Sequence, residues 1–363
     1  MLKRVSWTVV VPVLALVALA LTWGGKIGTA PALLEAVLLG GAVMAAVHHA
    51  EVVAHRVGEP FGSLLLAAAV TVIEVALIVE LMASGGNEAA TLARDTVFAA
   101  AMIATNGIAG LSLLLGSHRY GVTLFNAHGS GAALATLTTL ATLSLVLPTF
   151  TTSHQGGEFS PGQLTFAAIA SLLLYLLFVF TQTVRHRDFF VPIAQKGQRG
   201  LFADESHAEP PSTRAALTSL ALLVVALVAV VGLAEQESPA VERAVRAVGF
   251  PQSFVGIVIA MLVLLPETLA AVRAARQGRI QTSLNLAYGS ALASIGLTIP
   301  AIALVSTWLR APLVLGLGAT QLVLLVLTVV ISVLTVVPGR ATRLQGELHL
   351  VLLAAYVFLA VIP

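Results

Sequence analysis

The chain has 363 residues, a net charge of +2 and no cysteine, and 58% of its residues are hydrophobic while only 10% are charged. Soluble domains carry about 25% charged residues, so this chain cannot cover a water-facing surface of its own size. Lipid is the expected solvent for most of it. The absence of cysteine excludes disulfides, thiolate metal sites and a cysteine nucleophile. In such a chain the basic residues are topology signals and do not indicate nucleic-acid binding.

Apolar stretches long enough to cross a bilayer recur along the whole chain. A membrane helix needs about 20 apolar residues, and about eleven such stretches occur. They predict an all-α, polytopic membrane protein with spans near 7–24, 31–56, 61–84, 94–117, 121–149, 163–184, 215–233, 252–275, 281–308, 312–336 and 344–362. Small residues are frequent in these stretches, which suits close helix packing in lipid.

The positions of the basic residues predict the orientation. With the N-terminus in the cytoplasm, fourteen of the 19 Lys and Arg residues fall in cytoplasmic loops and the adjoining helix ends. This skew is the one that inner-membrane proteins show. The first apolar stretch follows Lys3 and Arg4 as in a signal peptide, but it is long and no clear cleavage site follows, so a retained span is expected. The sequence thus predicts a multi-pass protein of the bacterial inner membrane.

The polar stretch 185–214 divides the chain. It is predicted to be a solvated cytoplasmic linker between a first repeat of five spans at 31–184 and a second at 215–363, with 1–30 forming an additional N-terminal span. Because five is odd, the two halves enter the membrane from opposite sides. Such an inverted repeat places a substrate site near the midplane, between the halves.

Each half carries one glutamate in the middle of its second apolar stretch, Glu74 and Glu267. A carboxylate at this depth costs several kcal/mol unless it faces a cavity, a partner or an ion. No Lys or Arg lies near the predicted midplane to pair with either one. The two acids can therefore be protonated or can share a bound cation, and these states exclude each other on the same oxygens. This competition predicts proton/cation exchange; the structural alternative is a protonated glutamate that bonds a neighbouring helix.

Supporting oxygens are expected nearby, because calcium takes about 6–8 oxygen ligands. Thr71 lies one turn before Glu74. Asn106, with Thr105, and Ser290, with Gly289, occupy similar places in the small-residue helix that follows each glutamate. Asn285 and Ser294 are further oxygen candidates in the second of these helices. Each is a weak signal alone, because a single hydroxyl in a membrane helix usually bonds the preceding turn.

A second group of ionisable residues ends the second span. His48, Glu51, His55 and Glu59 fall on one helical face at spacings of three, four and four. Three interpretations stay open. The face could be a gate or proton relay, because histidine titrates near neutral pH; it could be a zinc site; or it could line a water-filled vestibule without further function.

Two segments resemble a known family. The run PETLAAVRAARQGRIQTSLNLAYGSALASIGLTIP, which contains Glu267, resembles the second repeat of the calcium/proton exchangers of the cation/calcium exchanger superfamily. The run GEPFGSLLLAAAVTVIEVALIVELMASG is similar to the ChaA branch of bacterial sodium, potassium or calcium/proton antiporters. The resemblance implies that Glu74 and Glu267 bind the cation and the protons, and that Gly289–Ser290 and Thr105–Asn106 supply neighbouring oxygens.

The sequence also departs from that family pattern. The exchangers carry G-N-x-x-E before each glutamate, whereas this chain has Val70–Thr71 and Val263–Leu264 at those places and Pro266 directly before Glu267. Ala293 replaces the amide expected after the second Gly-Ser pair. The missing amides remove candidate calcium ligands, which leaves sodium or potassium open as the transported ion.

The expected function is secondary active antiport, and the protein is not expected to be an enzyme. Calcium/proton exchange is the first hypothesis, sodium or potassium/proton exchange the second, and a cation channel with the glutamates as a selectivity ring the third. No phosphate-binding glycine loop supports ATP-driven pumping. The expected partners are inorganic cations, protons and the lipid bilayer, without nucleic acid or a resident cofactor, and a homo-oligomer stays open.

Overall fold

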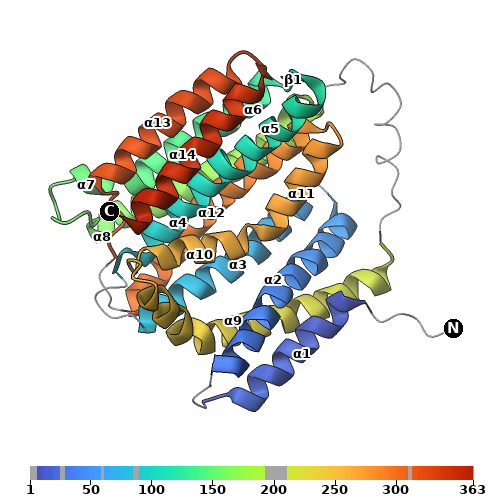
Figure 1. Cartoon of the computed structure of the whole chain (residues 1–363), viewed down its shortest axis with the longest axis vertical. Coiled ribbons are helices and arrows are strands. Elements are labelled where there is room, and N and C mark those ends of the chain that lie inside the picture. The colour runs from blue at the N-terminus through green and yellow to red at the C-terminus, as the bar shows by residue number, and fades with distance from the viewer. Residues whose placement is uncertain are drawn as a thin grey trace.

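The protein folds as a bundle of helices (Figure 1). The computed structural model describes residues 6–24, 29–58, 61–84, 90–192, 211–309 and 313–362. The helices of the first half, with their π-helical and 3-10 segments (η), are α1 (Trp7–Thr22), α2 (Thr29–Val57), α3 (Phe61–Ser84), α4 (Leu92–Met102), η2 (Ile103–Ile108), α5 (Ala109–Tyr120), α6 (Ala127–Ala141), η3 (Thr142–Val146), α7 (Leu147–Phe150), α8 (Pro161–Phe180), η4 (Thr181–Arg185) and η5 (Arg187–Phe190). Those of the second half are α9 (Thr213–Ala247), α10 (Phe254–Val263), α11 (Leu265–Arg276), α12 (Ile280–Leu309), α13 (Ala319–Val336) and α14 (Arg343–Val361).

Helices lie at all the positions where apolar stretches predict spans. Within the described residues, eight helical segments are long and apolar enough to cross a membrane, and the pair α10–α11, which bends by 56°, makes a ninth if it is one span. Helix α1 is apolar but has only 16 residues. The structure is therefore that of a polytopic, mostly helical membrane protein, and the count of eleven crossings stays a prediction.

Three predicted segments differ from the observed elements. The apolar part of α9, Thr213–Glu237, ends near the predicted position, but the helix itself continues through polar residues to Ala247, because loss of apolarity marks where a helix leaves lipid and not where it ends. Helix α13 begins at Ala319 rather than 312, because the preceding segment is held extended: the Leu317 N–H donates to the Leu145 carbonyl at 2.9 Å. The predicted linker is partly packed, since η5 buries Phe190 against Phe178; residues 193–210 lie outside the described residues.

The structure also contains elements that the sequence did not predict. Three short π-helical segments, η2, η3 and η4, interrupt or end the α-helices. Two strands of two residues each, β1 (Thr123–Leu124) and β2 (Arg340–Ala341), pair in antiparallel register, with Thr123 opposite Ala341. This pair joins a loop of the first half to a loop of the second.

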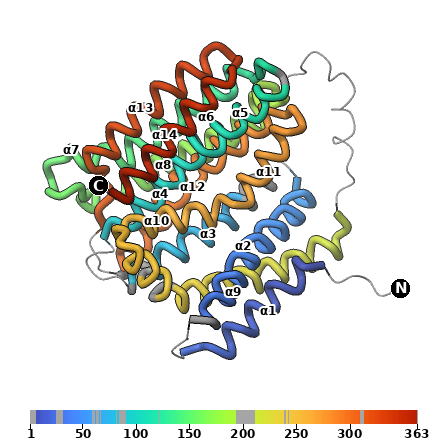
Figure 2. The backbone as a smooth tube through the Cα atoms, in the orientation of Figure 1, coloured from blue at the N-terminus to red at the C-terminus, as the bar shows by residue number. Residues whose placement is uncertain are grey.

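The halves pack on each other reciprocally. The second helix of the first half, α3, packs on α12, and its counterpart in the second half, α10, packs on α4. Helices α1, α2 and α9 form a separate group at one side of the molecule, whereas α13 and α14 lie on the opposite side (Figures 1 and 2). The interior between these groups holds α3, α10–α11 and α12. Helix α12 is central, because it contacts α3, α4, α6, α8 and α11.

Close approach of α5 and α14 depends on two glycines. A Cβ added at Gly346 would lie 2.6 Å from the Leu114 nitrogen and 2.8 Å from the Gly110 carbonyl oxygen. Because both are backbone atoms, they cannot rotate away, and overpacking of this kind costs about 1–3 kcal/mol. We predict that Gly346→Ala lowers the thermal stability of the detergent-solubilised protein. Gly162→Ala is the matched control, because a Cβ there meets nothing within 4 Å; equal melting temperatures for the two variants would contradict this packing.

Candidate functional site

A cavity of about 580 Å³ lies between the two halves. Helices α2, α3, α8, α10, α11 and α12 contribute its walls. It brings together five of the residues predicted for ion binding, Glu74, Glu267, Thr71, Gly289 and Ser290. Glu51, His55 and Gly58, at the end of α2, line it as well. Because Glu51 and His55 are exposed while Glu74 is buried, the cavity leads from this end of the molecule to its interior.

Glu74 is held at the inner part of the cavity by two hydroxyl groups. Its side chain is only 3% exposed. Ser294 Oγ donates to Oε1 at 2.6 Å and Thr298 Oγ1 donates to Oε2 at 3.1 Å. Both donors come from α12, so the carboxyl group of the first half is bonded by the second half. Hydrogen bonds to a charged oxygen are worth about 1.5–3 kcal/mol each, so these hydroxyls stabilise the ionised form.

Glu267 lies at the break between α10 and α11. Pro266 lies in the first turn of α11, where a missing N–H costs nothing, and it prevents α10 from continuing as one straight helix. Glu267 is also in this first turn, where the positive end of the helix dipole favours a negative charge. Its Oε2 atom is buried and, within the described residues, has no hydrogen-bond partner. A buried carboxylate oxygen without a donor carries an unfavourable desolvation cost when it is ionised.

The cavity is acidic. Glu267 experiences repulsion from both Glu51 and Glu74, so the three carboxyl groups share one electrostatic environment. Among the described residues, no Lys or Arg lines the cavity, and His55 is its one basic lining residue. Carboxylates that face one cavity without a cationic side chain among the described residues need protons or cations to balance their charge.

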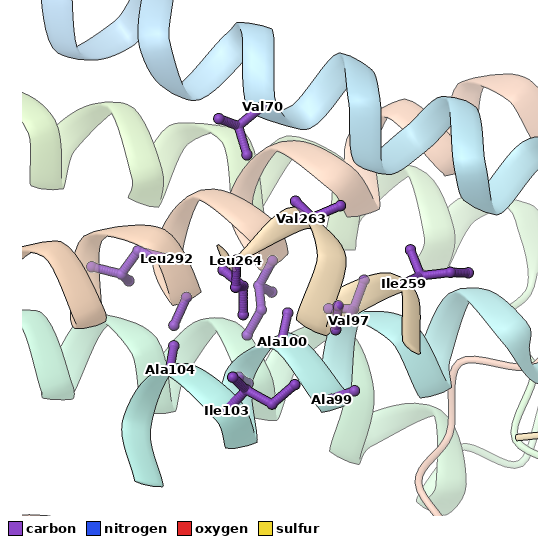
Figure 3. Close-up of a cluster of buried hydrophobic side chains, with 14 of the residues drawn as sticks. Val70, Val97, Ala99, Ala100, Ile103, Ala104, Ile259, Val263, Leu264 and Leu292 are labelled. Atoms are coloured by element: carbon purple, nitrogen blue, oxygen red, sulfur yellow. The ribbon is translucent and has the colours of Figure 1, made fainter. Parts of the chain in front are cut away.

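Apolar packing surrounds the break in α10–α11. Ile259, Val263 and Leu264 pack there against Val97 and other small residues of α4 (Figure 3). Figure 3 also shows Leu292 of α12 and Val70 of α3 in this cluster. In a low-dielectric surrounding each charge interacts more strongly with its ligand than in water. The apolar cluster therefore increases the energy difference between a carboxylate that is paired with a proton or cation and one that is not.

Thr298 and Tyr175 were not among the predicted ligands, whereas Ser294 was one of the weaker oxygen candidates. Ser294 and Thr298 bond Glu74, and Tyr175 of α8 lines the cavity. The signal for the first two was present, because Ser290, Ser294 and Thr298 recur every four residues along one face of α12. Tyr175 had no such signal, because its place depends on close packing of α8 on α12: a Cβ at Gly296 would lie 2.6 Å from Tyr175 Cβ.

Thr105 and Asn106 do not line this cavity. They lie in η2 and face α13 and α14 instead. Asn106 Nδ2 donates to Thr328 Oγ1 at 3.0 Å, and Asn106 Oδ1 is 2.9 Å from His349 Nδ1. The Thr105 hydroxyl donates to the Ala101 carbonyl one turn before it, at 2.6 Å. Thr105 and Asn106 are therefore not placed beside Gly289 and Ser290, contrary to the expectation that these four residues surround one ion.

The predicted face at the end of α2 is divided. Glu51 and His55 line the cavity, whereas His48 does not, although it interacts electrostatically with Glu51. Glu59 lies outside the described residues. In the described part of the chain, no three His, Asp or Glu side chains are arranged to hold a metal ion. The zinc interpretation of this face therefore has no support from the described residues.

Comparison with known proteins identifies the class. The chain belongs to the sodium/calcium exchanger protein family, whose model matches residues 27–184 and 218–362. The protein is thus a multi-pass membrane antiporter for cations, within the cation/calcium exchanger superfamily, and not an enzyme.

The chain is also similar over nearly its whole length to individual proteins of known sequence or structure. It is 46% identical over 364 residues to the putative ionic transporter y4hA of Sinorhizobium fredii, covering 98% of this chain and 96% of that protein. It is 35% identical over 354 residues to the sodium-potassium/proton antiporter ChaA of Escherichia coli, covering 96% and 94%. Among solved structures, native YfkE superposes with a TM-score of 0.71 at 16% identity, covering 98% of this chain and 99% of that one. The H⁺/Ca²⁺ exchanger CAX gives 0.68 at 16% identity, covering 97% and 91%.

Proposed function

We propose that the protein exchanges a cation for protons and that both compete for the carboxyl groups of Glu74 and Glu267. The observation that carries this proposal is the cavity that both glutamates line. Among the described residues, Glu267 has a buried oxygen without a hydrogen-bond partner, and Glu74 is bonded by the hydroxyls of Ser294 and Thr298. A cation that binds these oxygens displaces protons, and protons release the cation. No covalent chemistry is needed.

Charge balance favours calcium as the first candidate ion. Two protonated glutamates are neutral, and two ionised glutamates with one divalent cation are neutral as well. Exchange of two protons for one calcium therefore leaves the net charge of a buried site unchanged, which avoids the large cost of burying net charge. Glu74, Glu267, Thr71 and Ser290 line the cavity with oxygen atoms, the kind of ligand that calcium prefers.

Sodium or potassium is the second candidate. The relative that is 35% identical over nearly the whole chain is a sodium-potassium/proton antiporter. The hydroxyls of Ser294 and Thr298 already occupy one position on each Glu74 oxygen, which leaves fewer free lone pairs for a divalent ion. One monovalent cation could replace one proton while the second proton remains, and this exchange also preserves the charge.

The end of α2 is the proposed access route in this conformation. Glu51 interacts with His48, His55 and Arg273 at the mouth of the cavity, and it is also close enough to repel Glu267. Glu51 and His55 are thus placed to pass protons between water and the buried pair, as a gate or relay. Rocking of the two halves would close this mouth and open the opposite side.

Proteoliposomes with a pH dye inside test the exchange and the ion together. An outward cation gradient should drive protons inward at pH 8, and calcium, sodium, potassium and magnesium are tested in turn. The proposal predicts that calcium changes the internal pH; in the second form of the hypothesis, sodium or potassium does so. If exchange is electroneutral, this pH change occurs without an added membrane potential. Ion flux that carries current without any proton movement would identify a channel and refute the proposal.

A further inference from the structure

Two buried carboxyl groups outside the transport cavity have no role in the exchange described above. Glu35 of α2 is 2% exposed and Glu237 of α9 is 4% exposed. Helices α2 and α9 pack along each other (Figures 1 and 2), and the two side chains interact directly across this interface. Within the described residues, no N–H or O–H group donates a hydrogen bond to either carboxyl oxygen of Glu35. The same is true of Oε1 of Glu237.

Two ionised carboxylates cannot form this contact stably. Both are acceptors only, and like charges a few ångströms apart in a buried interface repel each other strongly. A carboxyl group that keeps one proton becomes a donor to its partner, and the pair then carries a single charge. We propose that Glu35 and Glu237 form a second proton-binding site, in which one proton is shared between α2 and α9.

The charged neighbours support a pair with one negative charge. Arg243, one to two turns further along α9, attracts the charge of Glu237. Glu80 of α3 and Glu235 of α9 repel each other, and helix α3 packs against α9. Helix α1 contributes no ionisable side chain among its residues 7–22. Among the described residues that act on Glu237, Arg243 is the basic one and Glu35 the acidic one, so a pair with a single negative charge is balanced better than a doubly charged pair.

A proton fits this pair better than a metal ion. In the part of the chain that the structure describes, no third His, Asp or Glu joins the two carboxyl groups in an arrangement that could hold a metal. The pair is also distant from the transport cavity: Glu35 precedes Glu51 by 16 residues of the same helix, which corresponds to about 24 Å at 1.5 Å per residue. The site is therefore independent of the proposed exchange and of the ion that is exchanged.

The shared proton has a consequence for stability. In the unfolded chain both carboxyl groups ionise freely, whereas the folded pair retains a proton, so the folded state binds more protons. Stability then falls as pH rises through the range in which the pair loses its proton. Glutamine at either position supplies a permanent N–H donor to the remaining carboxylate and should remove this dependence.

Infrared difference spectroscopy on the purified, full-length protein tests the site. We use Glu74→Gln combined with Glu267→Gln as the background, so that neither transport glutamate contributes a carboxyl band; Glu51, which also lines the cavity, is common to all variants and cancels in the comparison. This background should retain a protonated-carboxyl C=O band that disappears at alkaline pH. Adding Glu35→Gln or Glu237→Gln should abolish the band and flatten the fall of the melting temperature with pH. Glu235→Gln, at an exposed position of α9 two residues before Glu237, is the matched control and should leave the band in place.

Two results would overturn the proposal. One is a protonated-carboxyl band that persists unchanged in both the Glu35→Gln and the Glu237→Gln variants while size-exclusion chromatography shows folded protein. The other is displacement of the band by calcium or sodium at constant pH, which would make the pair a cation site. Because the transport glutamates are absent from the background, neither result depends on whether the exchange proposal is correct.

Discussion

Replacing Glu74 or Glu267 by glutamine should abolish cation-driven proton movement while leaving the protein folded. Glutamine keeps the size of the side chain but cannot ionise, so it neither releases a proton nor supplies a negative charge to a cation. Removing one charge from a buried ionic site costs about 3–5 kcal/mol, which corresponds to at least about a hundredfold loss of cation affinity. We expect transport in proteoliposomes to fall to the level of empty vesicles for either variant.

The matched control for this experiment lies on the same helix. Glu80 is six residues after Glu74 on α3 and does not line the cavity, so Glu80→Gln should retain exchange. Equal elution volumes on size-exclusion chromatography show that the three variants are folded. Full exchange by both Glu74→Gln and Glu267→Gln would refute the roles assigned to these residues.

Removing the hydroxyls that bond Glu74 should weaken cation binding at a fixed pH. In Ser294→Ala combined with Thr298→Val, the carboxylate loses both donors and is left buried without partners. Each such hydrogen bond is worth about 1.5–3 kcal/mol. Their loss therefore stabilises the protonated form of Glu74 relative to the ionised form. The cation concentration for half-maximal exchange should rise by at least about tenfold, and raising the pH should restore part of the loss, because fewer protons then compete.

Ser306→Ala provides the control for this double variant. Ser306 also lies on α12, but its hydroxyl donates to the Ala303 carbonyl and it does not line the cavity. Its half-maximal cation concentration should equal that of the wild-type protein. If the double variant also shows no change, the hydroxyls do not stabilise the ionised carboxyl group during exchange.

Much of the fold could be predicted because lipid imposes a simple rule on sequence. A helix that crosses hydrocarbon must be apolar over about 20 residues, and helices occur at each position where such a stretch was found. Boundaries failed where other forces decide them. The extension of α9 to Ala247 lies in a polar segment, and the late start of α13 follows from backbone bonds to Leu145 and Gly157 that no local pattern reveals.

The carboxyl groups of the site could be predicted because their cost in lipid makes them conspicuous. Glu74 and Glu267 lie in the middle of apolar stretches, and both line the cavity. Their hydroxyl partners are less visible, since many Ser and Thr residues in membrane helices only bond their own preceding turn, as Thr105 does. Asn106 shows the same limit: its position in the repeat suggested the cavity, but η2 aims it at Thr328 and His349.

The most direct test of competition at one site counts the protons released when the cation binds. Purified protein in weakly buffered detergent solution is mixed with calcium, or with sodium, and a pH indicator records the release over a series of starting pH values. The account predicts that the wild-type protein releases protons, that release decreases at high pH where the two acids are already ionised, and that Glu74→Gln with Glu267→Gln releases none. Cation binding by the wild-type protein without any proton release near neutral pH would contradict it.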